Sequence, residues 1–155
     1  MVERSEFHGT VGRTFAGGEP WWPPRAEAPE GAPNVVIVMV DDLGYSDLAC
    51  FGSELRTPHV DRLAAEGLRY TNFHVTPMCS PTRASLLTGL NPHLAGVGHV
   101  AHSDSGYPGY AMELRPDVST MPEVFRSAGY ATFMVGKRHL PKDSDQPAAG
   151  PRHPW

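Results

Sequence analysis

The chain has 155 residues, 40% of them apolar, which is enough for one ordinary domain with a hydrophobic core. Its formal net charge is −4 with no run of like charges, which disfavours nucleic acid and membrane surfaces as partners. Only Cys50 and Cys79 are present, so no disulfide framework or thiolate zinc site is expected. Because no signal peptide or membrane-spanning run is visible, the sequence predicts a cytoplasmic protein without a membrane partner.

Residues 1–33 are predicted to form an irregular, Pro/Gly-rich N-terminal arm. Prolines recur through its second half, and no periodic apolar pattern is present. Trp21 and Trp22 are its only large apolar pair. Burial of their rings would be the largest packing contribution available, so we expect them to pin the arm to the body of the protein.

The first regular elements are predicted between residues 34 and 75. Residues 34–40 (NVVIVMV) are β-branched and lack polar alternation, which is typical of a strand covered on both faces in a parallel sheet. Residues 58–66 begin with proline after a threonine and precede a glycine, which predicts a short helix. Residues 68–75 are rich in aromatic and β-branched residues and predict a second strand.

A second helix is predicted to begin immediately after Cys79. Ser80 and Pro81 resemble an N-cap and a first helical turn, and Gly89 supplies the stop. Such a helix start directs free backbone N–H groups and the positive end of the helix dipole toward its neighbourhood. The sequence therefore places Cys79 where an oxyanion can be bound.

The last regular elements are predicted between residues 120 and 135. Thr120 and Glu123 form a capping-box pattern, Gly129 ends the helix, and residues 130–135 (YATFMV) predict a third strand. Residues 141–155 are again rich in proline and glycine and are expected to be a loop-like tail.

Strands that alternate with helices predict an α/β fold with a largely parallel sheet flanked by helices. A parallel sheet of three strands normally continues until both edges are covered. We therefore expect residues 34–140 to be the N-terminal portion of an α/β domain, and the chain to stop inside that domain.

Two adjacent carboxylates, Asp41 and Asp42, follow the first predicted strand directly. Open α/β sheets bind ligands at the carboxyl ends of their strands, and hard divalent cations prefer oxygen ligands. A solvated turn is the alternative interpretation, since Asp-Asp before Leu-Gly is also typical loop sequence.

Arg83 lies one helical turn after Cys79 and can offer a planar fork of donors to a tetrahedral anion. Taken alone, a buried structural thiol and a surface arginine would be the commoner interpretation. The residues around Cys79 and Arg83 favour a functional site instead.

The string CSPTRASLLTG resembles the sulfatase signature, because Cys79, Pro81 and Arg83 occupy its three fixed positions. Residues 33–52 (PNVVIVMVDDLGYSDLACFG) resemble the opening strand and acidic pair of that family, and GKRHL at 136–140 resembles its GKWHL segment. The chain is thus similar to the type I, formylglycine-dependent sulfatases of the alkaline-phosphatase-like superfamily.

The resemblance implies that a separate formylglycine-generating enzyme oxidises Cys79 to formylglycine. The hydrated aldehyde would attack the sulfur of a sulfate ester, and its second hydroxyl would then lose a proton so that sulfate is expelled. Calcium, or magnesium, would be the cofactor, held by Asp41, Asp42 and the modified Cys79.

The same resemblance implies roles for three more residues. Arg83 would support the formylglycine and the metal site, Lys137 would contact the sulfate, and His139 would assist proton transfer or bind the sulfate group. Arg138 departs from the family pattern, since a tryptophan is usual there, which puts the packing near Lys137 and His139 in doubt. The metal ligands that the family carries far downstream lie beyond Trp155.

Three functions follow from these observations. The first is hydrolysis of an arylsulfate or another small sulfated compound. The second keeps the nucleophile but acts on phosphonate monoesters or phosphodiesters. The third is an inactive, truncated remnant that lacks the downstream ligands and serves only as an interaction module.

Overall fold

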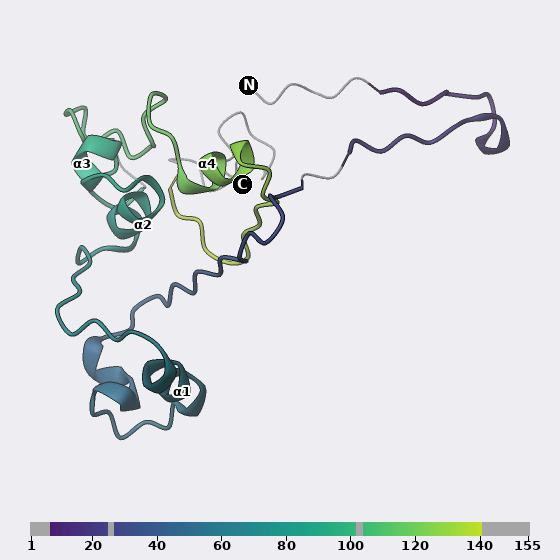
Figure 1. The fold of residues 1–155 in the computed structure, drawn as a ribbon. Coiled ribbons are helices and arrows are strands. Elements are labelled where there is room, and N and C mark those ends of the chain that lie inside the picture. Colours follow the sequence, from purple (N-terminus) through teal and green to yellow (C-terminus); the bar gives the residue numbers. More distant parts are fainter. Residues whose placement is uncertain (1–6, 25–26, 102–103, 141–155) are drawn as a thin grey trace.

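The computed structural model describes residues 7–24, 27–101 and 104–140 (Figure 1). Three short 3-10 turns precede the helices: η1 (Phe15–Gly17), η2 (Tyr45–Asp47) and η3 (Ala49–Phe51). The helices are α1 (Pro58–Glu66), α2 (Cys79–Thr88), α3 (Pro92–Ala95) and α4 (Met121–Ser127). Within these ranges no helix is long and apolar enough to cross a bilayer, and the cytoplasmic location stays a prediction.

The helices α1 and α4 form where their capping signals predict them. The bounds of α1 are those predicted, and its first turn is fixed by the Thr57 hydroxyl, which donates to the Asp61 carboxylate at 3.0 Å. The capping box of α4 is confirmed, with the Thr120 backbone N–H donating to Glu123 Oε2 at 2.7 Å. Both helices are specified by residues within a few positions of their ends.

The helix α2, which carries Cys79, begins one residue earlier than predicted. Met78 is the N-cap and Cys79 the first helical residue, so the assignment of Ser80 as N-cap is wrong. Ser80 is fully buried instead, and its hydroxyl accepts a hydrogen bond from the backbone N–H of Ala101 at 3.2 Å. This hydroxyl therefore ties a later loop to the helix rather than capping the helix start.

The three predicted strands, 34–40, 68–75 and 130–135, do not form. In the described ranges β-pairing is limited to two isolated antiparallel bridges, Thr10–Glu19 and Val97–Tyr110. A strand requires backbone partners and cover for its side chains, and neither is supplied here. Thus the largely parallel sheet is not built by the described residues, which contribute helices and extended segments.

Contacts at two points nevertheless align the first and third of these segments. The Glu27 carbonyl oxygen lies so near Gly129 that a Cβ at that glycine would be 2.3 Å away, and Asp41 meets Lys137 further along. The chain therefore runs in the same direction from Glu27 to Asp41 and from Gly129 to Lys137. Parallel strands would have this orientation, although no ladder joins the two segments.

A small apolar core lies where α2 and α3 pack together with the end of the described chain. Its buried members come from α2, from α3 and the residues after it, and from position 140, and they are Ala84, Leu87, Ala95, Val97 and Leu140. Leu140 is 3% exposed. Its burial holds the preceding residues 137–139 close to α2.

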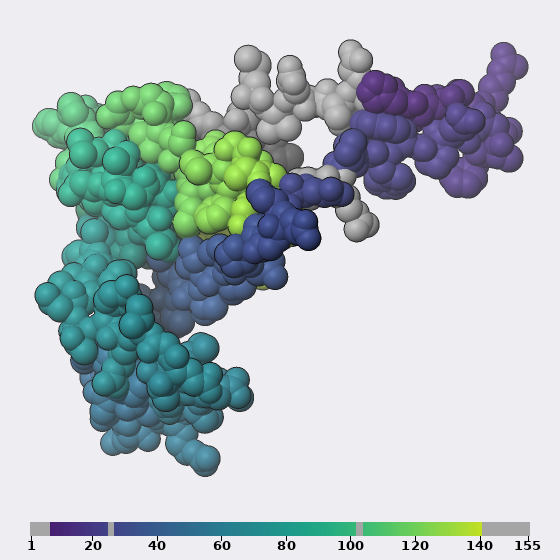
Figure 2. All heavy atoms as spheres, viewed as in Figure 1, coloured from purple at the N-terminus to yellow at the C-terminus, as the bar shows by residue number. Residues whose placement is uncertain are grey.

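Residues 7–24 of the N-terminal arm pack on one another rather than on the body. The ring of Trp21 lies edge-on to Phe7 and His8, at centroid distances of 6.4 and 5.0 Å, and Trp22 is 83% exposed. In the space-filling view residues 7–24 project away from the rest of the chain (Figure 2). The prediction that the two tryptophans pin the arm to the body is therefore wrong, and the predicted tail 141–155 lies outside the described residues.

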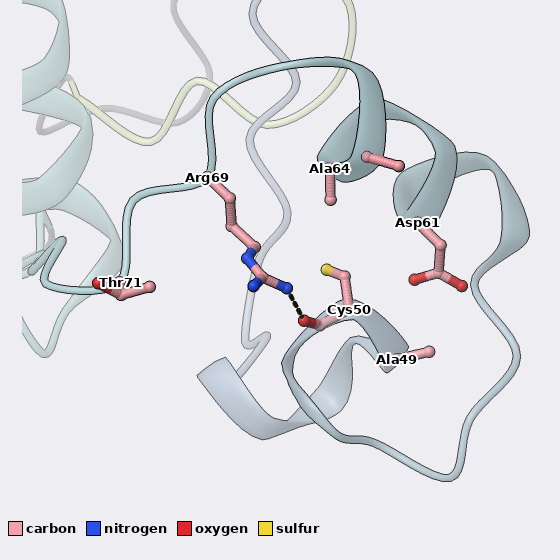
Figure 3. Close-up of a pocket in the computed structure, with 7 residues that line it drawn as sticks. Ala49, Cys50, Asp61, Ala64, Arg69 and Thr71 are labelled. Carbon is pink, nitrogen blue, oxygen red and sulfur yellow. Dashed lines mark hydrogen bonds between the residues drawn. The ribbon is translucent and has the colours of Figure 1, made fainter.

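A separate small unit contains η3 and α1, and a cleft of about 660 Å³ lies between them (Figure 3). Cys50 lines this cleft and is half-buried, so it is not the core residue that the sequence suggested. The Arg69 guanidinium donates to the Cys50 carbonyl and lies 5.5 Å from the Phe51 ring centre. Cys50 thus belongs to a unit distinct from the helix that carries Cys79.

Candidate active site

Cys79 and His139 form the centre of the candidate site. The Cys79 sulfur is 3.1 Å from His139 Nδ1, although 60 residues separate the two in sequence. Cys79 is fixed because it opens α2, and His139 is fixed because the next residue, Leu140, is buried in the core beside that helix. The arrangement places an imidazole nitrogen within hydrogen-bonding distance of the side chain at position 79.

Arg83 joins the start of α2 to two other segments. It lies four residues after Cys79, on the same face of the helix, and is 8% exposed. One terminal nitrogen donates to the Lys137 carbonyl oxygen at 2.5 Å and the other to Asp41 Oδ1 at 3.1 Å. Its Nε has no hydrogen-bond acceptor among the described residues, so one buried donor is available to an oxygen at the site.

Asp41 is held by two cations. Its Oδ1 accepts from Arg83, and its Oδ2 lies 2.6 Å from Lys137 Nζ. The hydrogen bond from Lys137, followed by that from Arg83, lowers the pKa of Asp41 below its ordinary value. The same bond to Asp41 raises the pKa of Lys137, so this pair is charged at neutral pH.

Two residues of the predicted site have a strained backbone. Asp42 and His139 both have φ near 53°, and they are two of the three described non-glycine residues in the left-handed region. Asparagine, aspartate and histidine enter this region more readily than most residues, at a cost of about 1–3 kcal/mol. Such strain persists where the surroundings fix the conformation, as the Leu140 anchor and the Asp41 ion pairs do here.

Five of the six predicted site residues lie in a network of contacts that has two parts. Cys79 contacts His139, and Arg83 contacts Asp41 and Lys137. The two parts are joined by the chain itself, through α2 and through residues 137–139. Asp42 is not joined to that network by a hydrogen bond or ion pair between described side chains, and its side chain is exposed. The replacement of tryptophan by Arg138 does not prevent Lys137 and His139 from reaching α2. Their predicted roles in catalysis stay predictions.

The described residues do not, as arranged here, fit a divalent cation. Calcium takes six to eight oxygen ligands and magnesium about six. No group of three or more described histidine, cysteine, aspartate or glutamate side chains is suitably clustered, and both oxygens of Asp41 are already engaged by cations. This part of the site therefore offers carboxylates without a complete ligand shell.

The sequence did not reveal the hydroxyl contacts that hold the loop before Cys79. The Thr82 hydroxyl donates to the Thr76 carbonyl oxygen at 2.9 Å, and the two hydroxyl oxygens are 2.6 Å apart. Both are ordinary residues on either side of a Pro-containing turn, so no periodic pattern marks them. Together with the Ser80 bond, they show that the variable letters of the signature attach α2 to its neighbours.

The sulfatase family model matches residues 33–150, which is well over half of the chain. The chain belongs to the sulfatase family. Membership implies an alkaline-phosphatase-like α/β fold. The resemblance drawn from the three sequence motifs is thereby confirmed, whereas the sheet itself is not.

Relatives of this chain are close in sequence but much longer. It is 46% identical over 121 residues to an uncharacterised sulfatase of Schizosaccharomyces pombe, covering 74% of this chain and 22% of that protein. It is 43% identical over 115 residues to arylsulfatase of Klebsiella aerogenes, covering 73% and 25%, and 43% identical over 115 residues to human arylsulfatase A, covering 70% and 21%. The chain thus spans about a quarter or less of the length of these relatives.

Proposed function

We propose that the protein hydrolyses sulfate esters through a formylglycine formed from Cys79. The observation that carries this proposal is the contact network around the start of α2. Within it, an imidazole lies 3.1 Å from the Cys79 sulfur and an arginine lies one turn further along the helix. Family membership supports sulfate-ester hydrolysis at a general level.

The side chains of the network suit the transfer of a tetrahedral anion. His139 Nδ1 is placed to hold or move a proton at the oxygen that would replace the Cys79 sulfur. Arg83 offers its unpaired Nε–H to an oxygen at the same site. Lys137 supplies a second positive charge for the sulfate group.

Formylglycine explains why the family signature begins with cysteine. A sulfated thiol or alkoxide would have to wait for water to attack sulfur, whereas a geminal diol releases sulfate through its own carbon–oxygen bond. We expect the formylglycine-generating enzyme to be the maturation partner of this chain. A small sulfated compound, such as an arylsulfate, is the proposed substrate.

Calcium, or magnesium, is the cofactor that we propose for the whole protein. When bound, such an ion lowers the cost of negative charge that develops on the reacting group. Asp41 and Asp42 are the carboxylates that this chain offers to it. The remaining oxygen ligands must come from other residues, since two carboxylates are too few.

Turnover measurements test the proposed function. We expect the protein, produced at full length together with the formylglycine-generating enzyme, to cleave an aryl sulfate much faster than an aryl phosphonate. Cys79→Ala should abolish turnover because no aldehyde can form, while Cys50→Ala is the matched control and should leave it intact. Faster turnover of the phosphonate would favour a phosphonate or phosphodiester hydrolase. Equal rates for Cys79→Ala and the unaltered protein would refute the proposal.

A further inference from the structure

The Cys79 thiol is paired with a base before any conversion to formylglycine. Its sulfur lies 3.1 Å from His139 Nδ1, and the cysteine is only half-buried, so a small molecule can reach it. In the neutral tautomer that carries its proton on Nε2, His139 accepts from the thiol through Nδ1. A cysteine paired with an imidazole in this way is the arrangement that activates sulfur as a nucleophile.

The imidazole is held beside the sulfur by the backbone around it. His139 has a φ of 53°, in the left-handed region, and the next residue, Leu140, is 3% exposed in the core beside α2. A shift of His139 away from Cys79 would pull Leu140 out of this core. The base is therefore already in place in the resting chain, which lowers the entropic cost of a reaction at the sulfur.

Donors for a negatively charged oxygen lie on the helix that carries this thiol. Cys79 is the first of the ten residues of α2, and Met78 supplies no side-chain cap for the N–H groups of the first turn. Arg83 is 8% exposed, and its Nε has no acceptor among the described residues. A buried donor without a partner is costly and favours an oxygen ligand. These donors suit the oxyanion that forms when a thiol adds to a carbonyl group.

The other thiol of the chain provides an internal reference. Cys50 is half-buried as well and lines the cleft beside α1, with its sulfur directed into that cleft (Figure 3). Within the described part of the chain, no histidine is hydrogen-bonded to the Cys50 sulfur. The two thiols therefore have similar exposure, and the paired imidazole is what distinguishes Cys79.

We propose that the chain, before its conversion, is a thiol acyl acceptor in which Cys79 takes the acyl group of an activated aryl carboxylic ester and His139 is the general base. The Cys79 sulfur bonds to the carbonyl carbon, and the bond from that carbon to the aryl oxygen breaks. The thiol proton passes to His139 Nδ1 and then to the aryl oxide or to solvent. The products are a thioester on Cys79 and a free phenol, so this activity belongs to the thiol form and does not rest on the proposed sulfatase reaction.

Acylation by p-nitrophenyl acetate tests this inference on the 155-residue chain, produced without the formylglycine-generating enzyme so that both thiols are kept. Nitrophenolate release gives the rate, and intact and peptide masses locate the acetyl group, which adds about 42 Da. We expect Cys79 to be acylated at least about tenfold faster than Cys50, because a positioned base assists only the first. Cys79→Ala should lose the fast reaction, and Cys50→Ala should keep it.

His139→Asn isolates the role of the base. Asparagine enters the left-handed region as histidine does and carries an acceptor oxygen near the position of Nδ1, but it does not take up a proton. Acylation of Cys79 should therefore slow by at least about tenfold. His74→Asn makes the same change at an exposed histidine that contacts Asn72, and it is the matched control, expected within about twofold of the unaltered chain.

Two results would overturn the inference. One is a rate for Cys79 less than about tenfold above that for Cys50, and the other is a smaller than tenfold loss in a folded His139→Asn chain. Circular dichroism shows whether that variant folds, and if it does not, the ratio of the two thiols in the unaltered chain decides alone. Failure here leaves the sulfatase proposal to its own test, because that reaction uses the aldehyde and the intact mass distinguishes the two forms.

Discussion

The region around α2 and the extended segments differ in what surrounds their apolar side chains. Ala84, Ala95 and Val97 are fully buried between α2 and α3. By contrast, Val36 and Val38 of segment 34–40 are each 82% exposed. The first region buries its apolar side chains with residues close in sequence, and the second has strand-like composition without neighbours that cover it.

This contrast explains where the candidate site forms. Its residues come from both regions, since Cys79 and Arg83 belong to α2, whereas Asp41 follows the exposed segment directly. Ion pairs and hydrogen bonds, rather than a sheet, hold Asp41 beside the helix. A few long-range contacts therefore assemble the candidate site around one packed helix.

Arg83→Met should give the largest loss of stability among the changes considered. It leaves Asp41 without its better-buried partner and deletes the bond to the Lys137 carbonyl, so we expect a loss of about 2–4 kcal/mol. Arg115→Met breaks the exposed pair with Asp117 and is the matched control, expected to cost much less stability than Arg83→Met. Urea denaturation measures both, and equal losses would mean that Arg83 does not join the two regions.

Leu140→Ala should rank next, because it empties a buried position beside α2. We expect the free energy of unfolding to fall by about 2–4 kcal/mol, and His139 to lose its fixed place near Cys79. Leu86→Ala changes a 39% exposed leucine of the same helix and should cost distinctly less. A smaller loss from Leu140→Ala than from Leu86→Ala would contradict the packing that anchors the GKRHL segment.

The Asp41 ion pairs should make stability depend on acidity. Because its pKa is lowered in the folded chain, Asp41 contributes stability that is fully present above its unfolded value and is lost as the pH falls through the lower folded value. The stability difference between the unaltered chain and Asp41→Asn should therefore shrink on acidification below that range. A difference that stays constant in denaturant titrations at successive pH values would show that the pairs do not form in solution.

Val36→Thr should have the smallest effect and sharpen the comparison most. At an 82% exposed position the change should shift stability by no more than about 0.5 kcal/mol. Val97→Thr makes the same change at a fully buried position and should cost about 1–3 kcal/mol, since a hydroxyl is buried. Equal, large losses at both positions would indicate that segment 34–40 is covered on both faces, as a central strand would be.

Elements that depend on interactions between residues close in sequence were predicted correctly, whereas those that depend on distant residues were not. The helices at 58–66, after Cys79 and after Thr120 were predicted because caps and glycine stops act within a few residues. The strands failed because their pairing depends on distant segments, which a β-branched run cannot specify.

The candidate site was predicted mainly from the family motifs, and the structure adds how its residues are held. The spacing within the signature predicted that Arg83 lies near Cys79. The sequence did not show that burial of Leu140 would hold His139 Nδ1 at 3.1 Å from the Cys79 sulfur. Nor did the sequence indicate that both oxygens of Asp41 would be paired with cations. Such contacts depend on packing between residues far apart in the chain.

The intact mass of the chain after co-expression with the formylglycine-generating enzyme tests the central claim most directly. Conversion of the Cys79 thiol to an aldehyde lowers the mass by about 18 Da. We expect this loss in the unaltered chain and in Cys50→Ala, and no loss in Cys79→Ala. A chain that keeps both thiols in cells equipped for the conversion would contradict the assignment of Cys79 as the formylglycine precursor.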